Sequence, residues 1–113
     1  MKTNTQKLQE IKELIVKLEK DTPTQINAFN KFMLATEKST VLGDKYTELI
    51  NVALAISAQC EWCIALHVKG ALGAGATKEE ILEAAMQAVL MHGGPALMYM
   101  ILVENALEEF TQE

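Results

Sequence analysis

The sequence predicts an all-α fold, a small helical bundle of about five to six helices that forms a single domain over residues 1–113. Three observations support this prediction. Half of the residues are hydrophobic but only 5% are aromatic, so the core must consist of aliphatic side chains, alanine and methionine. Alanine, leucine, glutamate and lysine are abundant, and these residues favour helix. Apolar side chains recur at helical spacing between glycine and proline breaks.

Two helices are expected before residue 40. The first covers about residues 4–20 and places apolar side chains at spacings of three and four: Leu8, Ile11, Leu14, Ile15 and Leu18. Pro23 separates the two helices, because proline disfavours helix at the preceding residue and suits the first turn of the next helix. The second helix, roughly residues 23–37, is expected to bury four side chains in the core or in a subunit contact: Ile26, Phe29, Phe32 and Met33.

The third predicted helix follows a turn at residues 42–44, with Asp44 as its N-cap. Its residues from 49 to 58 are apolar nearly all round, which is typical of a helix buried on several sides. Glu48 is therefore a carboxylate at the edge of an apolar environment. The chain is expected to fold back near residues 57–59 and to resume as a helix around Cys63.

Two further helices complete the predicted bundle. Glycines at 73 and 75 end the preceding helix, and Thr77 with Glu80 forms a capping box for a helix that continues to about Met91. A break at residues 93–95 precedes the last helix, which reaches about Phe110. Residues 96–103 of that helix are apolar without interruption, more than one small domain can cover, so we expect a homo-oligomer.

The charge and the distribution of apolar residues argue against a nucleic-acid partner, a membrane span and a secretory signal. The formal net charge is −5 and no basic cluster is present, which argues against a nucleic-acid partner. No apolar run approaches the roughly 20 residues that a membrane span needs. The first 20 residues are polar and charged, unlike a secretory signal, so we expect a cytoplasmic protein. In that reducing compartment, a close pair of cysteines is more often catalytic or metal-binding than structural.

The residues with chemical potential form one spaced set, Glu48-x11-Cys60-x2-Cys63-x3-His67. Cys63 and His67 are four residues apart and so share a helix face. A helix N-terminus and a nearby imidazole both favour the thiolate form of cysteine. If the chain folds back near residues 57–59, Glu48 lies beside His67, where its carboxylate can orient the imidazole. This arrangement predicts a reactive dithiol that cycles to a disulfide.

Other interpretations of these residues stay open. The cysteines fit two inert thiols in a core, and Glu48 fits a first-turn acid favoured by the helix dipole. A zinc site is a sharper alternative, and it would make the protein a zinc-binding or ligand-binding helical oligomer; its ligands would be Cys60, Cys63, His67 and His92. His92 otherwise fits a structural or pocket-lining residue, and Trp62 a lid or interface residue near the sulfurs.

The spaced set resembles the alkylhydroperoxidase D core of the carboxymuconolactone decarboxylase-like superfamily. The resemblance extends through residues 64–67, the turn at residues 73–81 and the break at residues 93–96, and it covers roughly residues 44–110. It implies an all-helical, oligomeric oxidoreductase that uses peroxide as acceptor, either a thiol-dependent peroxidase of the peroxiredoxin type or a disulfide reductase in antioxidant defence. A hexamer is expected, with a trimer as the next choice.

The resemblance also implies roles for the individual residues. Cys63 would be the thiolate that attacks peroxide, Cys60 would resolve the sulfenic acid, and His67 with Glu48 would form a proton relay. The substrate would be a peroxide or a disulfide, the reductant an external dithiol, and no cofactor would be needed. Trp62 stands where the best-studied members have a histidine. True decarboxylases of the superfamily lack the cysteine pair, so a decarboxylase or isomerase that uses His67 and Glu48 as acid and base is the alternative.

Overall fold

The computed structural model describes residues 2–38 and 40–112, and this part of the chain forms six α-helices and no strands. The bounds of the helices are α1 Asn4–Asp21, α2 Pro23–Glu37, α3 Asp44–Ser57, α4 Glu61–Gly73, α5 Lys78–His92 and α6 Gly94–Thr111. The all-α prediction is confirmed, and the predicted helix ends lie within about a residue of the observed ones, the margin expected of helix termini. No helix in the described ranges is long and apolar enough to cross a membrane.

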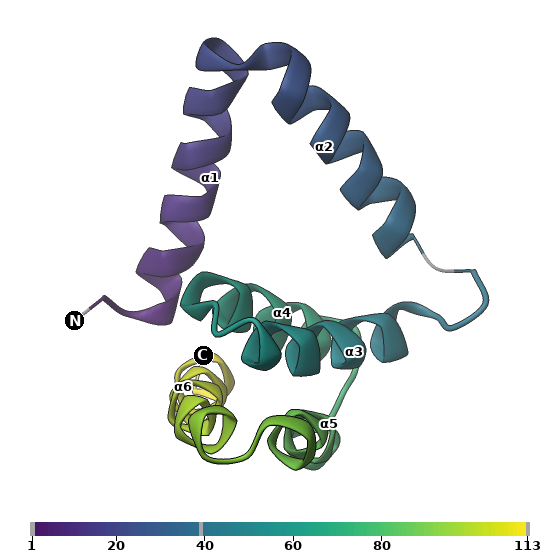
Figure 1. Ribbon diagram of the computed structural model, residues 1–113, viewed down its shortest axis with the longest axis vertical. Helices are drawn as coiled ribbons and strands as arrows, with labels where there is room; N and C mark the ends of the chain where they lie inside the picture. The colour runs from purple at the N-terminus through teal and green to yellow at the C-terminus, as the bar shows by residue number, and fades with distance from the viewer. Residues whose placement is uncertain (1, 39, 113) are drawn as a thin grey trace.

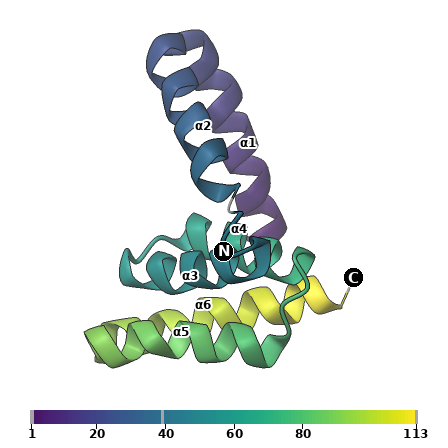
Figure 2. The ribbon, with the colours of Figure 1, turned by 90° about the vertical axis from the view of Figure 1, so that its right-hand side faces the viewer.

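The body of the molecule consists of two helical layers, α3 with α4 over α5 with α6 (Figures 1 and 2). The core lies between these layers and is made almost wholly of alanine, valine and isoleucine. Its largest fully buried side chains are Val52, Ile56, Ile64, Val68, Ile81, Val103 and Leu107. Small aliphatic side chains let the helices approach closely, which confirms the aliphatic core that the composition predicted.

Helices α1 and α2 form an arm that rises from the α3–α4 layer (Figure 2). The arm packs on the body through α1, which contacts α4 and is hydrogen-bonded at its first turn to Glu109 of α6, while α2 packs against α1. Ile26 is buried and Met33 is partly buried, but Phe29 and Phe32 are 54% and 65% exposed. The predicted burial of both phenylalanines in the core is therefore wrong, because α2 packs against α1 in the arm (Figure 1) and leaves its aromatic face uncovered; their burial in a subunit contact stays a prediction.

The exposure of α3 also differs from its prediction. Val52, Ala55 and Ile56 are buried as expected, but Ile50 and Leu54 are 46% and 59% exposed. Helix α3 is therefore covered by α4 and α5 on one side only. Apolar side chains of α3 that the sequence predicted to be buried therefore lie on the surface of the single chain.

The helix caps agree with the predictions in one case and differ in another. Thr77 and Glu80 form the predicted capping box of α5: Glu80 N–H donates to Thr77 Oγ1 at 3.1 Å, and Thr77 N–H donates to Glu80 Oε1 at 2.9 Å. Asp44, however, is not the N-cap of α3. Gly43 takes that position with φ 82°, a left-handed conformation that favours glycine, and Asp44 lies in the first turn, where its charge suits the helix dipole.

Candidate active site

The turn between α3 and α4 brings the predicted residues together. Gln59 N–H donates to the carbonyl of Ile56 at 3.0 Å, and Cys60 N–H donates to the carbonyl of Ala55 at 3.1 Å. This pair of hydrogen bonds is a Schellman motif, which ends a helix with one left-handed residue. That residue is Gln59, with φ 55°. The predicted reversal near residues 57–59 is confirmed, and it delivers Cys60 directly to the start of α4.

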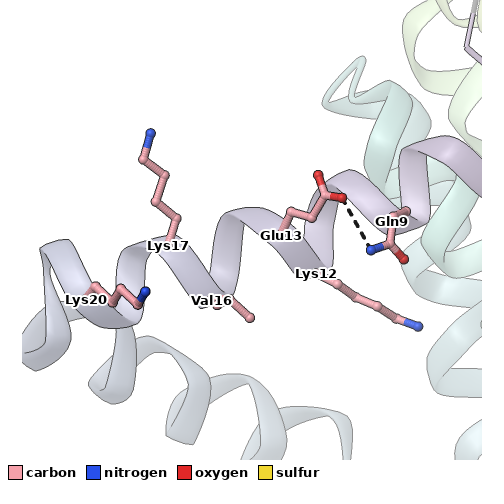
Figure 3. Close-up of a pocket in the computed structure, with 6 residues that line it drawn as sticks. All are labelled: Gln9, Lys12, Glu13, Val16, Lys17 and Lys20. Atoms are coloured by element: carbon pink, nitrogen blue, oxygen red, sulfur yellow. Dashed lines mark hydrogen bonds between the residues drawn. The ribbon is translucent and has the colours of Figure 1, made fainter.

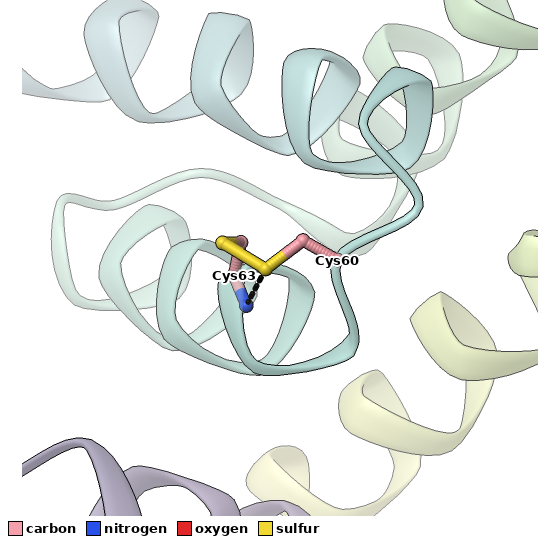
Figure 4. Close-up of a disulfide and its surroundings, with 2 residues drawn as sticks. All are labelled: Cys60 and Cys63. Atoms are coloured by element: carbon pink, nitrogen blue, oxygen red, sulfur yellow. Dashed lines mark hydrogen bonds between the residues drawn. A yellow bond between two sulfur atoms is a disulfide. The ribbon is translucent and has the colours of Figure 1, made fainter. Parts of the chain in front are cut away.

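The two cysteines occupy the first turn of α4. Cys60 is the N-cap and its sulfur accepts a hydrogen bond from Cys63 N–H at 3.1 Å. The two sulfurs form a disulfide, with 5.2 Å between the Cα atoms (Figure 4). Both cysteines are partly buried. The N–H of Cys63, in the first turn of α4, therefore faces the sulfur of Cys60, an arrangement that favours negative charge on this atom when the disulfide opens.

Glu48 and His67 meet across the α3–α4 pair. Nδ1 of His67 lies 3.3 Å from Oε2 of Glu48, and the two side chains are only 16% and 15% exposed. A carboxylate in its ionised form only accepts, so the contact with ionised Glu48 requires the tautomer of His67 that carries a hydrogen on Nδ1. The predicted juxtaposition of these residues is confirmed. His67 lies one helical turn beyond Cys63, so α4 joins the Glu48–His67 pair to the dithiol.

Gly70 is part of this arrangement, and its importance was not predicted. A Cβ atom at residue 70 would lie 2.8 Å from Cδ of Glu48, closer than such contacts occur in proteins. Glu48 also lines a hollow of about 310 Å³; its other lining residues are Glu37, Asp44, Gly70, Gly73 and Ala74. The signal in the sequence was a glycine inside a helical run, which weakens a helix and often has a packing reason.

Trp62 lies at the surface beside the dithiol and is held by α1. Its indole N–H donates to Oε1 of Glu10 at 3.0 Å. Hydrogen bonds from Lys2 and then from Trp62 lower the pKa of Glu10. Trp62 also borders an apolar hollow of about 410 Å³ with Glu10, Ile11 and Leu14. Trp62 is thus near the sulfurs as expected, and α1 supplies the neighbouring surface.

Glu61, the other residue between the cysteines, also contacts α1. Oε1 of Glu61 lies 3.6 Å from Nζ of Lys7, and Lys7 is only 5% exposed. Both residues of the spacer between the cysteines are therefore bound by the same helix. Sequence patterns gave no sign of these contacts, because they join segments more than 50 residues apart.

The remaining predicted residue, His92, lies elsewhere in the fold. It is the last residue of α5 and is exposed. In the described ranges no hydrogen bond or ion pair joins it to Glu48, Cys60, Cys63 or His67. Nor do these ranges contain a group of three or more His, Cys, Asp or Glu side chains placed to hold a metal ion. The zinc alternative with His92 as fourth ligand therefore has no supporting geometry.

A further hollow of about 360 Å³ lies along α1, away from the dithiol (Figure 3). Its lining residues are Gln9, Lys12, Glu13, Val16, Lys17 and Lys20. Gln9 and Glu13 are joined by a hydrogen bond of 3.4 Å, and the lysines extend into solvent. None of the predicted site residues takes part, so this hollow adds nothing to the chemistry of the dithiol.

Comparison with known proteins identifies the family. The sequence profile of the carboxymuconolactone decarboxylase family matches residues 21–104. The chain belongs to the carboxymuconolactone decarboxylase family. This result confirms the resemblance inferred from the spacing of Glu48, the two cysteines and His67, and the matched region includes all four residues.

Two solved structures of the carboxymuconolactone decarboxylase family share the fold. The apo structure of a family protein from Legionella pneumophila has a TM-score of 0.89 and 36% sequence identity, and the match covers 95% of this chain and 96% of that one. A Burkholderia xenovorans protein, assigned to the carboxymuconolactone decarboxylases, has a TM-score of 0.75 and 25% identity, with 88% and 80% of the two chains covered. The arm and the body are therefore both part of a fold that occurs in the family.

Two curated relatives are uncharacterized bacterial proteins. Protein 4 of the cox locus of Paracoccus denitrificans is 54% identical over 54 residues, which is 47% of this chain and 49% of that protein. A protein of Cupriavidus necator is 36% identical over 77 residues, which is 68% of each chain. The match thus spans about half the length of the first relative and two thirds of the second.

Proposed function

We propose that this family member is a thiol-dependent oxidoreductase that cycles Cys60 and Cys63 between dithiol and disulfide. The observation that carries the proposal is the disulfide at the N-terminus of α4, one turn before a histidine paired with a carboxylate. The oxidant would be a peroxide, as in peroxiredoxin-type antioxidant defence, or the disulfide of another molecule. The reductant would be an external dithiol.

In the oxidative half-reaction, the thiolate of Cys63 attacks one oxygen of the peroxide. The O–O bond breaks, Cys63 becomes a sulfenic acid, and the other oxygen leaves as an alcohol after it takes up a proton. The sulfur of Cys60 then attacks the sulfenic sulfur, so the disulfide forms and water leaves. Two thiols and one peroxide thus give one disulfide, one alcohol and one water. The Cα–Cα separation of 5.2 Å lies within the range that a disulfide requires.

In the reductive half-reaction, a thiolate of the external dithiol attacks Cys63 and Cys60 leaves as a thiolate. The hydrogen bond from Cys63 N–H to the Cys60 sulfur supports this direction, because it stabilises charge on the leaving atom. The second thiol of the reductant then attacks the mixed disulfide, which frees Cys63 and releases an oxidised reductant. Two electrons are transferred in each cycle.

His67 and Glu48 would move the proton in this cycle. With Nδ1–H bound to Glu48, the basic Nε2 of His67 accepts the thiol proton, directly or through water, and later returns it to the leaving group. The partly buried carboxylate stabilises the imidazolium formed in between. Trp62 and His92 remain proposals for substrate contacts; the hollow beside Trp62 supports such a role, and His92 has no comparable support.

Thiol titration before and after peroxide addition tests the proposal. Reduced wild-type protein should lose two thiols per equivalent of peroxide and regain them with a dithiol. Cys63→Ser should abolish peroxide consumption, while Cys60→Ser should consume one equivalent and stop at a sulfenic acid that dimedone traps. Unchanged thiol counts in the wild type, or full turnover by Cys63→Ser, would remove the dithiol from the mechanism.

A second candidate function rests on the Glu48–His67 contact, which does not involve the cysteines. The two residues could act as acid and base in a decarboxylation or isomerisation, as the family name suggests. A double variant, Cys60→Ser with Cys63→Ser, separates the candidates. Peroxide turnover requires the sulfurs, whereas acid–base chemistry on a lactone substrate should survive in this variant and disappear in Glu48→Gln.

We further propose that the protein acts in the cytoplasm as a homo-oligomer, a hexamer or next a trimer. The exposed apolar side chains of α2, α5 and α6 support assembly, since monomers rarely expose so many. A reducing cytoplasm would keep the dithiol available for peroxide.

A further inference from the structure

Glu48 reaches His67 by lying against a residue that has no side chain. Gly70 follows His67 by three residues on α4, and any Cβ atom there would overlap the Glu48 carboxyl group, with its Cδ only 2.8 Å away. The same carboxyl group provides the oxygen that lies 3.3 Å from Nδ1 of His67. The position of the carboxylate is therefore defined by His67 on one side and by the bare backbone of α4 on the other.

We propose that Gly70 is a positioning residue of the thiol site: its missing side chain lets the Glu48 carboxylate lie against His67. This inference rests on the proposed function, in which the Glu48–His67 pair promotes thiolate formation at Cys63. Gly70 touches neither sulfur nor substrate in this scheme. It acts through Glu48 alone, and this restriction makes its effect separable from that of a structural glycine.

The collision at residue 70 involves the far end of a flexible side chain. Gly70→Ala should therefore fold, because Glu48 can rotate away, and alanine is the better helix former in the middle of α4. A carboxylate that swings away from His67 can move into the adjoining hollow of about 310 Å³, which Glu48 already lines. The variant thus keeps the fold and loses the contact.

The charged groups around Glu48 come from several elements. Glu37 from the end of α2 and Asp44 from the first turn of α3 share its hollow, and His67 from α4 is its hydrogen-bond partner. Lys45, in the turn before Glu48, is 3.0 Å from Oε2 of Glu80 on α5. Among these groups, His67 is thus the hydrogen-bond partner of the Glu48 carboxylate, and its contact is the one that is lost when the carboxylate moves.

The experiment measures iodoacetamide alkylation of the reduced full-length protein as a function of pH, in a Cys60→Ser background that leaves Cys63 as the reacting thiol. We expect Gly70→Ala to move the midpoint of the profile to higher pH and to slow alkylation at pH 7 by about three- to tenfold, as a weakened thiolate–imidazolium pair requires. Glu48→Gln should act in the same direction. Gly73→Ala is the matched control: it adds a methyl group to the same helix and the same hollow, with nothing within 4 Å of it.

A double variant decides whether Gly70 acts through Glu48. In a Glu48→Gln background, Gly70→Ala should cause no further change, because the charge it displaces is already absent. A wild-type profile for Gly70→Ala, an equal shift in Gly73→Ala, or a full additional shift in the double variant would each overturn the proposal. Should Gly70→Ala fail to fold, its combination with Glu48→Ala, which removes the colliding group, should restore helicity; failure of that pair too would refute the proposal.

Alkylation does not depend on peroxide turnover, so the two proposals fail separately. A protein that reacts with neither a peroxide nor a disulfide substrate but shows the Gly70 shift would contradict the proposed reaction and support the positioning role. A protein that consumes peroxide but shows no Gly70 shift would support the proposed reaction and contradict the positioning role of Gly70.

Discussion

Glu109 and Asn4 are joined across 105 residues of sequence by two hydrogen bonds. The backbone N–H and the Nδ2 of Asn4 donate to Oε1 of Glu109, at 2.9 and 3.1 Å. The other carboxylate oxygen accepts from the N–H and Oγ1 of Thr5, at 2.9 and 2.8 Å. Glu109 thus caps the first turn of α1 from α6 and fixes the end of the helix that carries Lys7 and Glu10 to the dithiol segment.

The first prediction concerns acid stability. Burial raises the pKa of Glu109, but the hydrogen bonds from Asn4 and Thr5 outweigh it and lower the pKa from 4.5 to about 2. The ionised form is therefore stabilised by folding. This contribution is complete above pH 4.5 and is lost as the pH falls toward about 2. Glu109→Gln should reduce the free energy of unfolding at pH 7 by about 1–2 kcal/mol.

Chemical denaturation at pH 7 and at pH 3 provides the measurement. The difference between wild type and Glu109→Gln should shrink at the lower pH. Glu108→Gln, at the exposed neighbouring position, is the control and should remain close to wild type. An equal loss in both variants would mean that general charge, and not the cap of α1, is responsible.

The second prediction concerns Gln59, which ends α3 in a left-handed conformation. A side chain in this region costs about 1–2 kcal/mol that glycine avoids. Gln59→Gly should therefore raise the free energy of unfolding by about 1 kcal/mol, in spite of the greater entropy of the unfolded chain. Gly75, with φ 92°, ends α4 with the same pair of hydrogen bonds, and Gly75→Ala should be destabilising. A loss of stability in Gln59→Gly would show that the Gln59 side chain makes compensating contacts.

The sequence predicted those features that depend on neighbours along the chain. Helix bounds follow from apolar spacing and from glycine and proline breaks, and the capping box of Thr77 and Glu80 is a local pattern. The meeting of Glu48 with His67 was predictable because both lie about equally far from a single reversal at Gln59. The N-cap of α3 is a local feature that was predicted wrongly. Gly43 takes this position in place of Asp44, because the φ of 82° at this turn suits glycine.

The features that were missed depend on contacts between distant segments. No periodicity relates Glu10 to Trp62 or Asn4 to Glu109, so nothing in the sequence placed α1 beside the dithiol. The exposure of Phe32 depends on where α2 points, and helical spacing alone says nothing of this direction. Gly70 was visible as a glycine within a helix, but its neighbour Glu48 comes from another helix.

The third prediction concerns the imidazole beside the dithiol. His67→Ala should slow iodoacetamide alkylation of Cys63 at pH 7 by about tenfold, because the thiolate loses the group that takes its proton. The rates of variant and wild type should converge above about pH 9, where the thiol ionises unaided. His92→Ala removes the other histidine, which is exposed at the end of α5, and serves as the control. An alkylation rate that His67→Ala leaves unchanged would exclude the relay.

The fourth prediction uses Trp62 as a reporter. It is the only tryptophan of the chain, and it lies between the two cysteines in the first turn of α4. Disulfides quench indole emission at short range, so reduction should increase the fluorescence. Cys60→Ser with Cys63→Ser should not respond to reductant. Glu10→Gln should shift the emission maximum, because it weakens the hydrogen bond to the indole N–H.

The last prediction concerns assembly. Six large apolar side chains of α5 and α6 are at least 46% exposed: Met86, Leu90, Met91, Leu97, Met98 and Ile101. Contact with a second copy would remove this surface from water, at about 25 cal/mol for each Å² of apolar area. Light scattering of the wild type at micromolar concentration should therefore give the mass of a hexamer or a trimer. Leu90→Lys with Met91→Lys should lower that mass, since desolvating two ammonium groups opposes the contact. Thr40→Lys with Val41→Lys, on the connection between α2 and α3, is the charge-matched control. A wild-type monomer would show that these side chains face solvent in the working protein.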